Sequence, residues 1–336
     1  TIGGVVLAAI TVLPSVVRVP VTLQMLLSST ATIFFGSARA SMREAERKAA
    51  GDDARPREVL GGKDVYRFPI TASATLLALF LAFKYLPKEW VSRALTIGSV
   101  TLGAAGVASV ISPLVERVLP GDAWMKKRIG PTETFSVDAL ELVTLLMAAP
   151  IGVWYAMTKH CIANNLLAVS LAYSAVEMLG LEDFQSGAVL LSGLFFYDVF
   201  WVFYSKRVFG DNVMVAVAKQ FEGPIKVVFP KFPGASDPKD HSLLGLGDIV
   251  LPGIFIAMLF RFDEHVIPGH DAEINPRYKP YFTTNMVLYV AGLLTTNVMM
   301  LWFEHAQVSL LKGGGGKCHF GLANPPTHPV PQPALL

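Results

Sequence analysis

The sequence predicts an all-α polytopic membrane protein, with eight visible transmembrane spans and the start of a ninth. Of the 336 residues, 52% are hydrophobic and only 16% are charged, whereas an average soluble domain has roughly 25% charged residues. The apolar residues form runs of about 20, the length at which a helix crosses the hydrocarbon core of a bilayer. Charged segments separate these runs, as expected for loops between spans.

The first four apolar runs are divided by charged segments. The longest of these segments, Arg39–Arg67, follows the first run. Three basic residues lie around the gap after the second run, and a basic segment from Arg117 to Arg128 follows the third. Each interruption separates two helices, because charged side chains are unfavourable in hydrocarbon. The first four predicted spans are Val19–Gly36, Phe68–Leu86, Ala94–Pro113 and Ala139–Met157.

The other four runs follow the same rule. Lys159 marks the gap before the fifth run, and the long segment Ser205–Ser242 divides the sixth from the seventh. The last four residues, Pro333–Leu336, are expected to start a ninth span that the end of the sequence cuts off. The predicted spans are Ile162–Leu181, Gly187–Tyr204, Leu243–Phe260 and Phe282–Phe303.

The first residues are apolar but do not form a clear span. Ile2–Val17 is short, contains Pro14 and is followed by Arg18. It is therefore either a signal-like segment or an extension of the first span. The sequence starts at Thr1 without a methionine, so we expect a truncated N-terminus.

The distribution of lysine and arginine predicts the orientation. Basic residues near the ends of transmembrane helices stay on the cytosolic side. The segments after the first and third runs are richer in Lys and Arg than those after the second and fourth. Odd-numbered spans should therefore end in the cytosol, and the N-terminus should be lumenal or extracellular. The segment Ser205–Ser242 breaks the pattern, but long loops carry less weight in this rule.

Composition excludes several functions. The net charge is +2 and no basic cluster is interleaved with aromatic residues, so we expect no nucleic-acid partner. Cys161 and Cys318 are too few for a disulfide framework or a zinc site. The glycines at Gly313–Gly316 are not followed by the Lys-Ser/Thr pair of a phosphate loop. We therefore expect no metal and no cofactor.

Two acidic residues lie inside apolar runs. Asp198 is in the middle of the sixth run, in the stretch GLFFYDVFWVFY, and Asp248 is early in the seventh, in LGLGDIVLPG. A charge near mid-membrane costs at least ~2.5–3.5 kcal/mol, so an acid at that depth indicates a function. Gly245 and Gly247 place no side chains beside Asp248, which lets a backbone or a substrate come close.

Two carboxyls on neighbouring antiparallel helices favour one kind of chemistry. Like charges a few ångströms apart cannot both ionise, so such a pair shares one proton. The ionised member can take a proton from water, and the protonated member can donate to the carbonyl oxygen of a peptide bond. This is aspartic proteolysis. Intramembrane acids also serve proton- or ion-coupled carriers and channels, and the two residues alone leave that alternative open.

Three short motifs, in this order, resemble the signatures of the GxGD intramembrane aspartyl proteases. They are Tyr197–Asp198, Gly245–Asp248 and Pro333–Leu335. The stretches FYDVFWVF, NVMVAVAK, PIKVVFP and LGLGDIVLPGIF are most similar to the signal peptide peptidase branch of that family. The resemblance runs from about Arg67 to Gln307 and includes the last four residues. Presenilins share the motifs, but their loop between the two Asp-bearing spans is long and acidic, and this loop is shorter and not acidic.

The resemblance implies a presenilin-like bundle of nine helices in the endoplasmic reticulum membrane, with a lumenal N-terminus. It implies cleavage, within the bilayer, of signal peptides and other type II-oriented segments, so the expected partners are transmembrane signal-peptide substrates and the lipid bilayer. Whether the chain forms a homo-oligomer is left open. The residues that match the catalytic pair are Asp198 and Asp248, and those that match site-shaping positions are Tyr197, Gly245, Leu246, Gly247, Pro333, Ala334 and Leu335.

Two features depart from the family pattern. The segment Val308–Gln332 separates Phe303–Gln307 from the Pro-Ala-Leu motif, and its removal would leave FEHAQPALL, which resembles an uninterrupted family member. We interpret the segment as a retained in-frame intron or a gene-model error, with a disordered loop as the alternative. The ninth span is also incomplete after Leu336. A catalytically inactive, truncated family member is therefore a further alternative.

The predicted organisation is one membrane domain in six parts. Residues 1–67 hold the N-terminal spans and the charged loop, 68–186 hold spans two to five, 187–260 hold the catalytic sixth and seventh spans, and 261–307 hold the eighth. Residues 308–332 are the insert and 333–336 begin the ninth span.

Four polar residues of the fifth apolar run and its border are not expected to be catalytic. Glu177 lies near the end of this run and is predicted to be interfacial or hydrogen-bonded. His160, Asn164 and Asn165 lie at its start and are predicted to cap the helix or to make interhelical hydrogen bonds.

Overall fold

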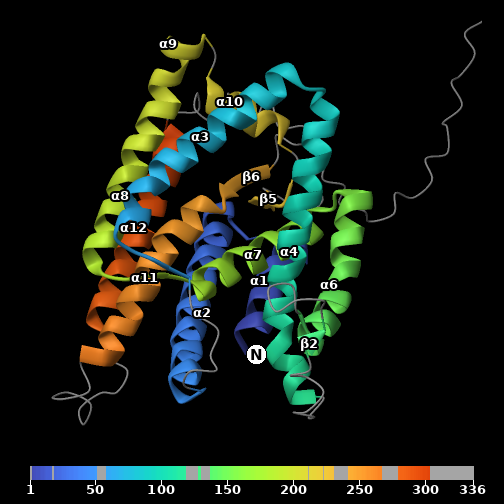
Figure 1. Cartoon of the computed structure of the whole chain (residues 1–336), viewed down its shortest axis with the longest axis vertical. Helices are drawn as coiled ribbons and strands as arrows, with labels where there is room; N and C mark the ends of the chain where they lie inside the picture. The colour runs from blue at the N-terminus through green and yellow to red at the C-terminus, as the bar shows by residue number, and fades with distance from the viewer. Residues whose placement is uncertain are drawn as a thin grey trace, which may run out of the picture.

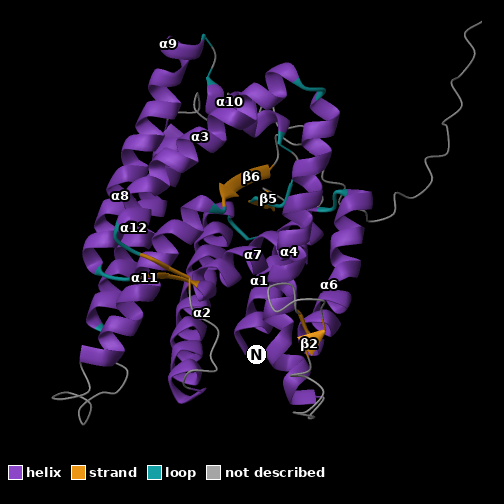
Figure 2. Cartoon of the chain, in the orientation of Figure 1, coloured by secondary structure: helices purple, strands orange, loops and turns teal. Residues whose placement is uncertain are grey.

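The computed structural model describes residues 2–16, 19–50, 58–118, 128–129, 137–210, 212–221, 223–230, 241–266 and 279–302. Within these ranges the chain is a bundle of long helices with three two-stranded sheets (Figures 1 and 2). The prediction of an all-helical membrane protein is confirmed, since six helices of the described part are long and apolar enough to cross a bilayer. The small sheets were not predicted.

The N-terminal residues form two separate helices. α1 (Ile2–Val16) packs against α2 (Val21–Ala50), and residues 19 and 20 between them are not helical. The first apolar segment is therefore a helix of its own, and the alternative of an extended first span is wrong. α2 continues beyond the predicted end of the first span, so part of the charged segment is helical. Its Lys and Arg side chains can leave the membrane while the backbone stays hydrogen-bonded.

The next helices follow the predicted runs closely. In chain order they are α3 (Lys63–Tyr85), α4 (Lys88–Val118), α6 (Ala139–Thr158), α7 (Cys161–Met178) and α8 (Phe184–Val199). After α8 the chain continues as a π-helix, η3 (Phe200–Tyr204), and the short helices α9 (Ser205–Phe209) and α10 (Val213–Gln220). The seventh and eighth apolar runs form α11 (Gly247–Val266) and α12 (Pro280–Trp302).

The three sheets join segments that are apart in the sequence. β1 (Glu58–Leu60) pairs in parallel with β4 (Leu179–Leu181), β2 (Arg128–Ile129) pairs with β3 (Val137–Asp138), and β5 (Lys226–Pro230) pairs with β6 (His241–Gly245). Two predicted span boundaries are corrected by these strands. The fifth span ends before β4, and the seventh begins after β6, because glycines at 180, 245 and 247 disfavour helix.

The core lies where α2, α7, α11 and the β5–β6 hairpin meet. Ile33, Ala172 and Ile249 come from the three helices and are fully buried there. Small residues allow close approach: a Cβ at Gly106 of α4 would lie 2.8 Å from the backbone nitrogen of Leu171 in α7. Such contacts are typical of helices that associate in lipid.

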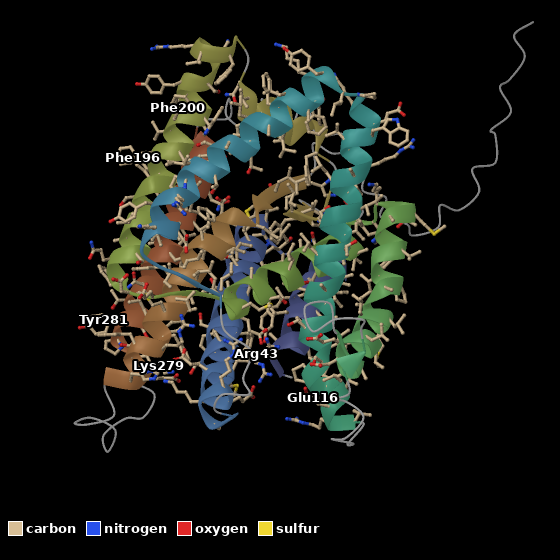
Figure 3. The ribbon with its side chains drawn as sticks, in the orientation of Figure 1. Arg43, Glu116, Phe196, Phe200, Lys279 and Tyr281 are labelled. Carbon is tan, nitrogen blue, oxygen red and sulfur yellow. The ribbon has the colours of Figure 1, made fainter. Side chains whose placement is uncertain are left out.

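The outer surface of the bundle carries large apolar side chains. Phe196 and Phe200 point away from the neighbouring helices, and Figure 3 shows both on the outer side of α8 and η3. Their exposed fractions are 69% and 41%. An apolar patch of this kind on a helix of bilayer length is suited to contact with lipid chains.

Candidate active site

α8 carries Asp198 and begins with a defined cap. Asp183 precedes the helix, and its carboxylate accepts a hydrogen bond from the backbone N–H of Ser186, at 2.8 Å. This bond satisfies one of the free N–H groups of the first turn. Near this end, Gly187 lies against Phe255 of α11, since a Cβ at position 187 would be 2.4 Å from the Phe255 ring. Glycine therefore lets α8 and α11 approach closely.

The backbone changes from α-helical to π-helical geometry shortly after Asp198. In η3 the N–H of Ser205 donates to the carbonyl of Phe200, five residues earlier. A π-helical turn leaves carbonyl groups without their usual partners, and Asn212 satisfies one by donating to the carbonyl of Val202 at 3.0 Å. π-helical turns inside helices are frequent at functional sites. The turn gives the sixth span a local irregularity beside its acidic residue.

Asp248 lies in the first turn of α11. The carbonyl of Leu246 starts this helix, because it accepts the N–H groups of Ile249 and Val250 at 3.1 and 2.8 Å. The N–H of Leu246 donates in turn to the carbonyl of Ile225, at 3.0 Å, which ties the helix start to the segment before β5. The Asp248 carboxylate accepts a hydrogen bond from the Gly245 N–H. Its position is therefore defined by the junction of β6 and α11.

Two asparagines of α7 hold the β5–β6 hairpin in place. The side-chain amide of Asn165 donates to the carbonyl of Val228 at 2.7 Å and accepts from the Val228 N–H at 2.8 Å. Asn164 donates to the carbonyl of Lys226 at 2.8 Å. They pair with β5 much as a neighbouring strand would. The two asparagines therefore bond to a strand, which corrects the expected interhelical hydrogen bonds. His160 caps α7 as expected, because its Nδ1 accepts the Ile162 N–H.

The structure brings the two intramembrane acids together. α8 and α11 run in opposite directions (Figure 1) and touch at Gly187 and Phe255. At 1.5 Å per residue, Asp198 lies about 16 Å along α8 from this contact, and Asp248 lies about 10 Å along α11 in the same direction. Both side chains are exposed on the described chain, so a substrate can reach them.

The glycines beside Asp248 leave space at its carboxyl group. A Cβ at Gly245 would meet the Asp248 Oδ2 at 3.4 Å, and a Cβ at Gly247 would meet only Leu251, at 3.9 Å. These are ordinary van der Waals distances, and neither glycine has a positive φ. The internal packing of the described residues therefore does not require glycine at either position, and the space lies open next to the acid.

The remaining predicted site residues fall into two groups. Tyr197 is half-buried next to Asp198, with its ring tilted against Trp201 at 6.4 Å between centroids. Pro333, Ala334 and Leu335 lie outside the described residues, as does the segment Val308–Gln332. The structure therefore places two of the three predicted motifs.

Sequence reasoning missed one contact at this site. The hydroxyl of Tyr289, on α12, donates a hydrogen bond to the backbone carbonyl of Asp248 at 3.1 Å. A tyrosine in an apolar run does not by itself indicate a site residue, because its ring is equally favourable in contact with lipid. Among the described residues, no group of three or more His, Cys, Asp or Glu could hold a metal ion.

Comparisons with known proteins agree with the motifs. A family model described as signal peptide peptidase matches residues 52–312. The chain is 39% identical over 303 residues to signal peptide peptidase of Homo sapiens, covering 85% of this chain and 75% of that protein. It is 28% identical over 332 residues to signal peptide peptidase-like 1 of Oryza sativa subsp. japonica, covering 87% and 86%. It is 42% identical over 183 residues to intramembrane protease 2 of Caenorhabditis elegans, covering 52% and 37%. No solved structure matched the chain.

Proposed function

This chain belongs to the signal peptide peptidase family of intramembrane aspartyl proteases, and we propose that Asp198 and Asp248 are its catalytic pair. The observation that carries this proposal is that the antiparallel helices α8 and α11, which touch at Gly187 and Phe255, place Asp198 and Asp248 on the same side of that contact. Family membership favours proteolysis over the carrier or channel that the two acids alone would also allow.

The proposed reaction is the hydrolysis of a peptide bond by water. The ionised carboxylate removes a proton from a water molecule, whose oxygen attacks the carbonyl carbon, while the protonated carboxyl donates its proton to the carbonyl oxygen. Collapse of the tetrahedral intermediate breaks the C–N bond. The leaving nitrogen takes a proton from the acid that received it from water, and a hydroxyl of the intermediate returns its proton to the other carboxylate, so the pair again shares one proton. Tyr197 and the glycines of the Gly245–Asp248 motif shape the site around this chemistry.

The β5–β6 hairpin offers a place for the substrate backbone. β5 occupies one edge of β6, and no described strand pairs with its other edge. β6 ends at Gly245, which is hydrogen-bonded to Asp248. An extended peptide that pairs with this edge of β6 would lie next to Asp248. A transmembrane substrate must unwind to adopt this form, so helix-breaking residues near the scissile bond should promote cleavage.

We assign the substrates to signal peptides and other type II-oriented transmembrane segments, and the location to the endoplasmic reticulum with the N-terminus in the lumen. The charge distribution supports this orientation. Arg43 of α2 and Lys279 before α12 lie towards the same end of the molecule (Figure 3), and α4 ends there after Glu116 and Arg117. Cytosolic ends of spans are rich in Lys and Arg.

Cleavage of a labelled signal peptide by the purified, reconstituted protein tests the catalytic pair. Asp198→Asn and Asp248→Asn should each reduce cleavage below detection and leave membrane insertion intact. Asp64→Asn, at an exposed position at the start of α3, is the matched control and should cleave at the wild-type rate. Cleavage by either single variant of the pair would overturn the assignment. Ion flux by a wild-type protein that cleaves nothing would favour the carrier alternative, and a wild-type protein with neither activity would favour the inactive one.

Cysteine labelling tests the orientation. In a Cys318→Ser background, Glu46→Cys at the end of α2 and Glu89→Cys at the start of α4 introduce exposed thiols that the proposed orientation places on opposite sides of the membrane. In intact microsomes, a membrane-impermeant maleimide should label position 46 and should label position 89 only after permeabilisation. The reverse pattern would place the end of α2 in the lumen and overturn this orientation.

A further inference from the structure

The backbone carbonyl of Asp248 lies where α11 lacks a hydrogen-bond donor. In an α-helix the carbonyl of each residue accepts the N–H of the residue four positions later. Four positions after Asp248 is Pro252, which lies within α11. Proline has no N–H, and its ring crowds the carbonyl of the residue four positions before it. The oxygen of the proposed catalytic residue therefore cannot form the regular helical bond.

A side chain from another helix supplies the missing donor. The hydroxyl of Tyr289, on α12, donates to the Asp248 carbonyl at 3.1 Å. The same hydroxyl lies beside the side chain of Ser29, a fully buried residue of α2. The phenol thus connects three helices at the first turn of α11.

The start of α12 is also attached to α11, near the end of that helix. The N–H of Phe282 donates to the buried carboxylate of Asp263, at 2.8 Å. Lys279, just before α12, forms an ion pair with Glu264 at 2.6 Å. α12 is thus attached to α11 at its start and, through Tyr289, in its middle.

We propose that Tyr289 is a positioning residue for Asp248. Its hydroxyl replaces the N–H that Pro252 lacks, which fixes the first turn of α11 and thereby the direction of the Asp248 carboxyl group. This inference rests on the proposed catalytic role of Asp248. It explains why a proline can lie one turn after that residue without leaving its carbonyl unpaired.

The inference predicts that the effect of removing the hydroxyl depends on the proline. Tyr289→Phe should lower kcat by about threefold to tenfold, the range that corresponds to one hydrogen bond, with little change in KM. Pro252→Ala restores the N–H of position 252. In that background Tyr289→Phe should lower kcat by less than about twofold, because the helix now supplies the bond.

The matched control is Tyr281→Phe, which removes a hydroxyl from the same helix. Tyr281 lies at the far end of α12, against Phe262, as its label in Figure 3 shows. This variant should keep the wild-type kcat in either background. Thermal unfolding in detergent micelles, measured in parallel, separates a loss of fold from a loss of rate.

Five variants and one reference decide the inference. An unchanged kcat in Tyr289→Phe, or an equal loss in the wild-type and Pro252→Ala backgrounds, would overturn it. Loss of fold in Tyr289→Phe with no recovery in the double variant would show a structural role alone and would also overturn it. Asp248→Asn in the same assay is the reference: if it still cleaves, the proposed function fails, whereas if it is inactive the result for Tyr289 stands by itself.

Discussion

The indole Nε1–H of Trp201 donates a hydrogen bond to the hydroxyl of Ser73, at 3.0 Å, and so joins η3 to α3. Trp201 is 3% exposed and its ring stacks on Phe209 at 5.8 Å. The bond lies three residues after Asp198, in the segment where the helix changes to π geometry. It therefore fixes the part of the sixth span whose backbone is least regular.

Removal of this bond should lower both stability and rate. We expect Trp201→Phe to destabilise the protein by about 1–3 kcal/mol, from a lost hydrogen bond and a smaller ring, and Ser73→Ala by about 1 kcal/mol. Cleavage should slow in both, since Asp198 is no longer held as firmly. The double variant should lose no more than Trp201→Phe alone, because both substitutions remove one interaction. Thermal unfolding and single-turnover cleavage check this, and additive losses would show that the two residues act separately.

Asn165 should be needed for the β5–β6 hairpin. Asn165→Leu leaves the N–H and the carbonyl of Val228 without their partners in a buried setting, at a cost of about 2–4 kcal/mol. The KM for a peptide substrate should rise, since β6 shifts with β5. Asn285→Leu removes an exposed amide from α12 and is the control, with a change below about 0.5 kcal/mol. Equal melting temperatures for the two variants would contradict the role of Asn165.

Glu177 should stabilise the joint between α7 and α2. Its carboxylate, 1% exposed, pairs with the Nε of Arg43 at 2.6 Å and of Arg39 at 3.4 Å. Glu177→Leu should cost about 3 kcal/mol, at the lower end for a broken buried pair, because both guanidiniums keep partial access to water. The exposed pair Glu89–Arg93 offers the contrast, and Glu89→Leu should change the unfolding free energy by under about 1 kcal/mol.

His160 should make stability depend on pH near neutrality. Burial lowers the pKa of its imidazole below the ordinary value of 6.5. Its Nδ1 accepts the Ile162 N–H at 3.2 Å, which requires the unprotonated nitrogen. Between the lowered pKa and 6.5 the unfolded chain binds more protons than the folded one, so stability falls as pH drops below 6.5.

An asparagine at this position can cap the helix without titrating. His160→Asn should therefore show a flatter dependence of melting temperature on pH between about 5 and 7 than the wild type, with little difference above pH 7. A wild-type curve that is already flat in this window would contradict the assignment to His160.

The helices could be predicted from the sequence because an apolar run of bilayer length has few alternatives. β6 could not, because its residues Leu243 and Leu244 are as apolar as the helix that follows. Gly245 and Gly247 mark the boundary in the sequence, because glycine disfavours helix. The sequence also indicated that the two acids lie on neighbouring antiparallel helices, as α8 and α11 do.

The Tyr289 contact could not be predicted, because it depends on the rotation of α12 about its own axis. An apolar helix in lipid carries no amphipathic pattern from which that rotation can be read. One local signal was present, since Pro252 follows Asp248 by four positions and leaves its carbonyl in need of a donor. The sequence could therefore indicate that a partner was required, and only the packing of α12 identifies it.

The attachment of α12 to α11 at two points has a mechanical consequence. The two helices support each other against bending, so Asp248 lies on the more rigid side of the site. Asp198 lies beside the less regular π-helical segment η3, which the bond from Trp201 to Ser73 joins to α3. A substrate bound between the two acids should therefore displace the sixth span and leave the seventh and eighth spans nearly unmoved.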